Sequence, residues 1–151
     1  MPSYSLDRII RTLRSFMCST GLPRPDRLVI STRSGSVHAE FTSGTAPDRL
    51  AALLLWTTQL DGLTLTWTLR PDNTLTVAAT ARNRAGLTFG LTASAEVSAF
   101  GGVPVGKAAV TLGPFRLAPI VVEPVTFEEV ARLVQLGRVV SARSTRVGLA
   151  A

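Results

Sequence analysis

The chain has 151 residues, of which 46% are hydrophobic and 17% charged, and its formal net charge is +6. This composition is typical of one globular domain and excludes a disordered chain. No apolar run approaches the roughly 20 residues that a membrane helix needs, and no apolar block precedes the first charged residues. We therefore expect no membrane span, no signal peptide and a cytoplasmic location. Cys18 is the only cysteine, which excludes an internal disulfide and a cysteine-based metal cluster.

The positive charge is concentrated at the two ends of the sequence. Residues 1–33 contain six arginines and two aspartates, and residues 130–151 contain four arginines and no acid. The segment between them has two more acidic than basic residues. All basic residues except Lys107 are arginine, a bias that a GC-rich coding genome would also produce. Basic ends on a near-neutral body point to an acidic partner.

The first predicted element is an amphipathic helix over residues 5–17. Its apolar residues recur at helical spacing, Ser5 is a suitable N-cap and Gly21 ends the segment. At about 100° per residue, Arg8, Arg11 and Arg14 lie on the side opposite the apolar stripe. Cys18 should be buried where this stripe ends.

A hairpin over residues 27–42 and a second helix over residues 46–60 follow. Thr45 with Asp48 three residues later resembles a capping box, and Gly62 should stop the helix. The helix is apolar on both sides and needs two neighbours, namely the sheet and either another helix or a second copy of the protein. The residues on its second side are therefore interface candidates: Leu53, Trp56 and Leu60.

The stretch from residue 63 to residue 99 predicts a meander of three antiparallel strands. Apolar residues alternate with polar ones, with turns at residues 70–74 and 83–86. Many of the polar positions are threonines, which suit a solvent-facing sheet. A flat, uncharged threonine face also does little to prevent the docking of another sheet, so Thr64, Thr66 and Thr68 are further interface candidates.

The remaining segments predict two short strands and a third helix. The strands should cover residues 108–112 and 120–123, and Thr126 with Glu129 forms a capping box for a helix that ends near Gly137. Residues 138–151 should form a basic, mobile tail. The whole order predicts a two-layer α+β domain over residues 1–137, with an antiparallel sheet of about five to seven strands and three helices mainly on one face.

The sequence contains no convincing catalytic or metal-binding set. Residues 101–107 have the spacing GxxxxGK of a phosphate-binding loop, but Ala108 replaces the magnesium ligand and the next segment is too short for the required helix. His38, the only histidine, should share the solvent face of its strand with Glu40. We therefore predict no enzyme, no metal and no cofactor.

We predict a small non-enzymatic binding protein whose basic ends contact an acidic partner, most simply the backbone of a nucleic acid. The candidate contacts are Arg8, Arg11, Arg14, Arg138, Arg143 and Arg146. The alternative is a structural or assembly protein that self-associates through the threonine face and the second helix. A further possibility is an adaptor that holds a peptide along an edge strand near Ala108.

Overall fold

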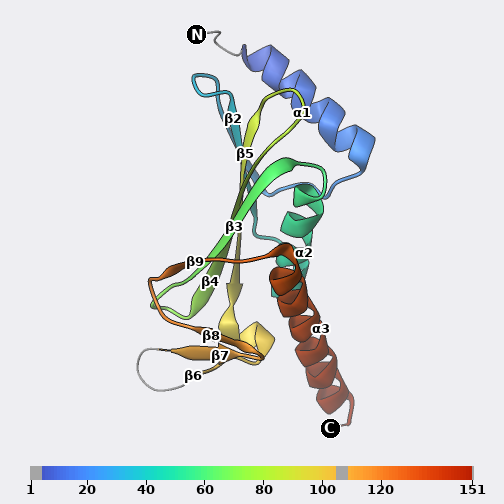
Figure 1. Ribbon diagram of the computed structural model, residues 1–151. Helices are drawn as coiled ribbons and strands as arrows, with labels where there is room; N and C mark the ends of the chain where they lie inside the picture. The colour runs from blue at the N-terminus through green and yellow to red at the C-terminus, as the bar shows by residue number, and fades with distance from the viewer. Residues whose placement is uncertain (1–4, 105–108, 151) are drawn as a thin grey trace.

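The computed structural model describes residues 5–104 and 109–150 and shows an α+β fold in two layers (Figure 1). The helices are α1 (Leu6–Thr20), α2 (Ala46–Thr57) and α3 (Phe127–Ala150), with a short 3-10 turn, η1 (Val97–Phe100). The strands of the main sheet are β1 (Arg27–Ser31), β2 (Ser36–Phe41), β3 (Asp61–Leu69), β4 (Thr74–Arg82), β5 (Thr88–Glu96) and β9 (Val122–Pro124). The three helices lie on one side of this sheet, as the sequence predicts.

The central meander is confirmed. Strands β3, β4 and β5 are antiparallel neighbours, and the register places Val77 opposite Trp67 on one side and Ala93 on the other. From Leu65 onward the alternating apolar residues of the three strands are buried, and the threonines and serines between them are at least partly accessible, whereas Leu63 at the start of the pattern is exposed. The alternation of residue types therefore determines which face the helices cover. The last predicted strand ends earlier than expected, because Val97 to Phe100 turn into η1.

The sheet is mostly antiparallel, as predicted, but one pair of strands is parallel. Its order is β1-β2-β5-β4-β3-β9, and the pair β2–β5 is parallel. Parallel neighbours need a long connection. Here the chain leaves β2, passes through α2, and returns to β2 only after β3 and β4. As a result the first residues of β2 and β5 lie side by side, at the same end of the strands.

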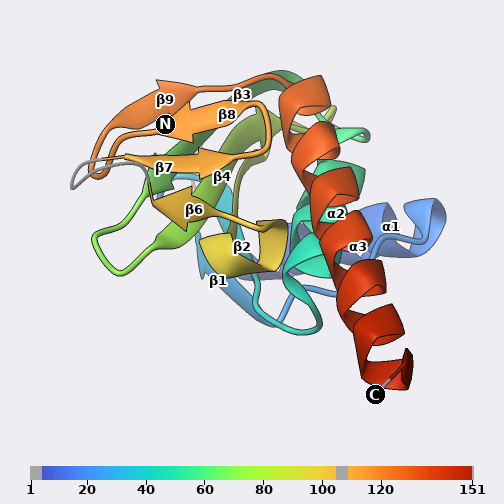
Figure 2. The same cartoon turned by 90° about the horizontal axis from the view of Figure 1, so that it is seen from below.

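A second, smaller sheet contains β6 (Val103–Pro104), β7 (Val110–Leu112) and β8 (Phe115–Leu117). The sequence predicts β7 and β9 approximately, but β8 is missed because Gly113 and Pro114 separate it from β7 by a tight turn. In Figure 2, which views the molecule from below, the small sheet lies on the side of β9.

Helix α2 packs against the sheet and also contacts both other helices. The Phe16 ring of α1 packs against Trp56, with 5.8 Å between ring centroids, and α3 packs beside α2 (Figure 2). The Trp56 indole N–H donates to the carbonyl of Pro23 at 2.8 Å. The second neighbour of α2 is thus another part of the same chain. The helix ends at Thr57 and not near Gly62, which has a φ of 64° within an irregular start of β3.

Helix α3 continues well past Gly137, so the predicted end of the helix is wrong. A Cβ atom at Gly137 would lie 2.6 Å from Pro47 Cγ and 2.8 Å from two atoms of the Phe100 ring. The glycine therefore allows α3 to approach the start of α2 and η1 closely, and does not terminate the helix. The basic segment that follows is helical as far as Ala150.

Within the described ranges, none of the helices is both long and apolar enough to cross a membrane.

Candidate functional site

The structure separates the six predicted arginine contacts into two groups. Helix α1 carries Arg8, Arg11 and Arg14, all exposed, while α3 carries Arg138, Arg143 and Arg146. Arg138 and Arg143 are exposed, and the side chain of Arg146 is outside the described part. The two helices lie at opposite ends of the molecule (Figure 1). The basic ends of the sequence therefore do not form one continuous surface.

The arginines of both groups lack an internal counter-charge. Across residues 5–104 and 109–143, the structure has one ion pair, between Arg49 and Glu96 at 3.4 Å. The five described arginines of the prediction have no carboxylate within ion-pair distance. Their charge is available to an external partner, since exposed cations without partners are compensated only by solvent and salt.

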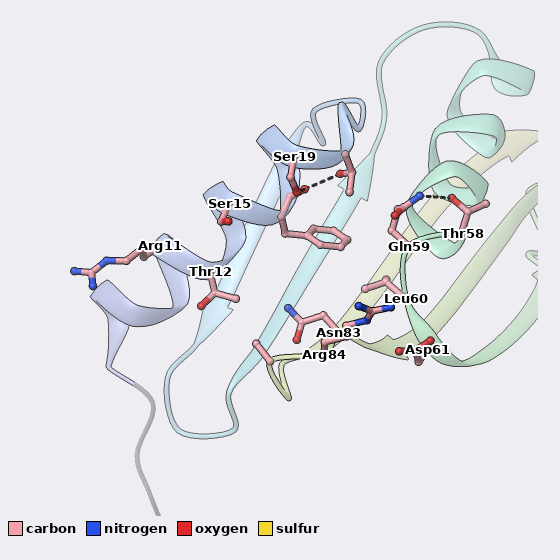
Figure 3. Close-up of a pocket in the computed structure, with 13 residues that line it drawn as sticks. Arg11, Thr12, Ser15, Ser19, Thr58, Gln59, Leu60, Asp61, Asn83 and Arg84 are labelled. Carbon is pink, nitrogen blue, oxygen red and sulfur yellow. Dashed lines mark hydrogen bonds between the residues drawn. The ribbon is translucent and has the colours of Figure 1, made fainter.

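An open groove lies beside α1, with a volume of about 780 Å³ (Figure 3). Helix α1 forms one wall, and the α2–β3 connection and the β4–β5 turn form the other. Its lining residues are Arg11, Thr12, Ser15, Phe16, Ser19, Thr20, Thr58, Gln59, Leu60, Asp61, Asn83, Arg84 and Ala85. We call this concavity the α1 groove.

Arg84 is the arginine that the sequence analysis missed. It lies in the β4–β5 turn, where the side-chain oxygen of Asn83 accepts a hydrogen bond from the backbone N–H of Leu87 at 2.9 Å. The turn is completed by a hydrogen bond from Gly86 N–H to the Asn83 carbonyl at 3.1 Å, with a φ of 86° at Gly86. Figure 3 shows Asn83, Arg84 and Asp61 along the side of the groove opposite α1, while Arg11 extends away from the groove.

The groove side of α1 carries hydroxyl groups. Thr12, Ser15 and Ser19 are spaced three and four residues apart and so lie along one side of the helix. The Ser19 hydroxyl donates to the Phe16 carbonyl at 3.2 Å, whereas no hydrogen bond is found for the hydroxyls of Thr12 and Ser15 within the described part. These two groups remain able to donate to and accept from a ligand.

More arginines lie at the same end of the molecule as the groove. Strands β2 and β5 begin at this end and β1 and β4 finish at it, so the β1–β2 and β4–β5 turns are neighbours. A hydrogen bond of 3.2 Å joins them, from the Thr88 N–H to the Gly35 carbonyl. Residues of α1 and of the β4–β5 turn also line one small cavity together. We call this region the basic end, defined by Arg8, Arg11, Arg14, Arg33, Arg82 and Arg84. Its acidic residues are Asp7 and Asp61.

The predicted protein interface divides into a buried part and an open part. Leu53, Trp56 and Leu60 are buried in the core, with exposures of 0%, 0% and 8%, so they cannot contact a second protein. That part of the prediction is wrong because the Trp56 side of α2 faces the sheet, where its ring packs against Phe41 and Phe89, and is also covered by Phe16 of α1. Thr64 is exposed, and Thr66 and Thr68 are partly exposed on the sheet face that no helix covers (Figure 1).

This open sheet face contains a second cavity of about 330 Å³, lined among others by His38, Glu40 and Arg70. His38 is exposed, as expected. Its ring lies over Gly90 on β5, where an added Cβ atom would come within 2.7 Å of the imidazole Nδ1. The glycine in β5 thus makes room for the imidazole.

The remaining candidates have no chemical set around them. Cys18 is exposed and not buried as predicted. Among the described residues, no three His, Cys, Asp or Glu side chains are grouped so that they could hold a metal ion. The second half of the GxxxxGK spacing, including Lys107, and the edge position Ala108 lie outside the described residues.

Searches for a similar family model, for a similar curated protein and for a similar solved structure found no match to this chain.

Proposed function

We propose that the protein is a small non-enzymatic binding module that holds a phosphate-bearing partner, most simply the backbone of a nucleic acid, at its basic end. The observation that carries the proposal is the group of arginines without carboxylate partners around the α1 groove. The α1 arginines are those that the sequence analysis selects, and Arg84 adds a fourth from a distant segment.

The chemistry of arginine supports a phosphate partner. A guanidinium group donates two parallel hydrogen bonds to phosphate, and each neutralised phosphate releases condensed counterions. Arg8, Arg11 and Arg14 recur every three residues along α1, which corresponds to about 4.5 Å of helix rise per step. A linear polyanion can therefore meet several of them at once, whereas a single small anion would meet one.

The arginines of α3 form a separate and weaker candidate. Arg138 and Arg143 lie at the other end of the molecule, and neither lines the α1 groove. They therefore offer charge away from this groove. This difference provides a comparison between two sets of arginines within one chain.

The experiment measures the binding of labelled oligonucleotides by fluorescence anisotropy across a salt series. The variant R8A/R11A/R14A should bind more weakly, and its slope of log affinity against log salt should fall by about 2 for single strands. The matched control is R138A/R143A, which should retain most of the affinity. Circular dichroism checks that both variants remain folded. The proposal fails if micromolar wild-type protein leaves the oligonucleotides free at about 50 mM salt.

A second candidate function, assembly through the sheet, is favoured by the uncovered threonine face and by edge strand β1. Leu28 and Val29 on β1 are 38% and 45% exposed, and an exposed apolar edge can pair with another strand. This candidate predicts a dimer or larger particle that persists at high salt. The double variant T66K/T68K or the edge variant V29K should reduce the mass measured by light scattering. A wild-type protein that is monomeric at all concentrations contradicts it.

A further inference from the structure

We infer that the α1 groove takes an unpaired nucleic-acid strand, with the bases inside the groove and the phosphates outside along α1. This inference rests on the proposed function and specifies its ligand. It concerns the shape of the site, the groups on its walls and the positions of its charges.

The shape of the site favours a strand over a duplex. A cavity of about 780 Å³ falls within the range of roughly 300–1,000 Å³ found for sites that enclose small ligands. A double helix is a convex cylinder whose bases are paired in its interior. It could touch the rim of such a cavity but could not fill it. An unpaired nucleotide can turn its base into a recess of this size.

The walls carry the groups that contact bases and sugars. The oxygen of the Asn83 amide is held by the Leu87 N–H, so the NH₂ group is the part of this amide that remains for a ligand. Across the groove, Thr12 and Ser15 provide two hydroxyls. Phe16 provides an apolar surface, and its ring is held in place by Trp56 and Phe89 at centroid distances of 5.8 and 5.5 Å.

The charges indicate which part of the strand enters. Asp61 lines the groove and forms no ion pair within the described part. Arg84 also lines the groove and can meet a phosphate, but a phosphate placed beside the Asp61 carboxylate itself would be repelled, whereas the exocyclic amine of a base could donate to it. Arg11, in contrast, extends away from the groove (Figure 3). At about 100° per residue, Arg8 and Arg11 lie beside Ser15 on the helix surface. The phosphates therefore follow the arginines of α1, and the bases face the hydroxyls.

The test compares a fluorescein-labelled single strand of about 12 nucleotides, a length within known site sizes, with the duplex of the same sequence. Wild-type protein should bind the single strand about tenfold more tightly, which corresponds to stacking of one base. The groove-blocking variant S15W should remove this preference by weakening the binding of the single strand about tenfold.

The matched control is C18W, which places the same bulky side chain at an exposed position of α1 that does not line the groove. It should leave the preference for the single strand unchanged. Equal affinity of the wild-type protein for strand and duplex, or equal effects of S15W and C18W, would overturn the inference while the proposed function stands. The absence of binding to either probe would instead refute the proposed function, and the inference with it.

Discussion

Replacing Gly137 by alanine tests the close approach of α3 to the rest of the fold. In the interior of an exposed helix, this change would stabilise the protein by about 0.8–1.0 kcal/mol. Here the new Cβ atom would lie 2.6 Å from Pro47 and 2.8 Å from Phe100. Neither ring can move easily, because Pro47 is in the first turn of α2 and Phe100 is buried. Overpacking of this kind costs about 1–3 kcal/mol.

The net expectation for G137A is a loss of about 1 kcal/mol, or roughly 2–4 °C in melting temperature for a domain of this size. Thermal unfolding followed by circular dichroism measures it. The control compares alanine with glycine at Gln135, an exposed position of the same helix, where alanine should be the more stable residue. A G137A protein that melts above the wild type, by an amount similar to the difference at position 135, would refute the close packing.

Three other changes test separate parts of the structure. The pKa of Asp26 is lowered from 3.8 to about 2 by hydrogen bonds from the Ser43 hydroxyl and from the backbone N–H groups of Thr42 and Ser43. The Asp26 carboxylate therefore stabilises the fold fully above about pH 4, and this stabilisation is lost as the pH falls towards 2. The melting temperatures of D26N and wild type should accordingly differ at pH 7 and converge below pH 4. A difference in melting temperature that does not change with pH contradicts this. G90A should shift the NMR resonances of His38, the only histidine, because the new methyl group would lie against the imidazole. Stability should change little, since the exposed imidazole can rotate away. Unchanged resonances of His38 contradict the contact between its ring and Gly90. W56F should lower the free energy of unfolding by about 2–3 kcal/mol, because the indole is buried and its N–H is hydrogen-bonded to the Pro23 carbonyl. The mass measured by light scattering should not change. A change in mass without loss of stability would place Trp56 at an interface.

The elements that are predictable from the sequence depend on contacts between near neighbours. The alternation of residues 63–97 needs only the pleat of a strand to be interpreted, and it is confirmed. The capping residues are equally local. The hydroxyls of Ser5 and Thr45 accept hydrogen bonds from the backbone N–H groups three residues later. Thr126 and Glu129 form the expected capping box, in which the side chain of each accepts a hydrogen bond from the backbone N–H of the other. Each of these signals is complete within four residues of chain.

The errors occur where a residue serves a distant contact. Gly137 resembles a helix stop in its own sequence, but its role is set by Pro47 and Phe100, which are far away in the chain. Trp56 resembles an interface residue because the pattern of α2 cannot show that α1 returns to cover it. The parallel pair β2–β5 depends likewise on the path of the chain through α2 and two strands.

The candidate site was predictable only in part, for the same reason. The α1 arginines can be recognised from one helical segment. The groove cannot, because it is formed by three segments that are distant in sequence, and Arg84 has the sequence context of an ordinary turn residue. The sequence does place Thr12, Ser15 and Ser19 on one side of α1, next to Arg8 and Arg11, but it does not show what lies opposite them.

The use of the acidic residues explains why the arginines are free. Asp26, Asp72 and Glu129 accept hydrogen bonds from backbone N–H groups at turns and at a helix start, and Glu96 pairs with Arg49. These carboxylates stabilise the fold through local backbone contacts and do not approach the basic end. The positive charge there is consequently compensated only in part, by Asp7 and Asp61, neither of which forms an ion pair within the described residues. An anionic partner would gain its electrostatic attraction without breaking any internal ion pair, so its affinity should depend steeply on salt.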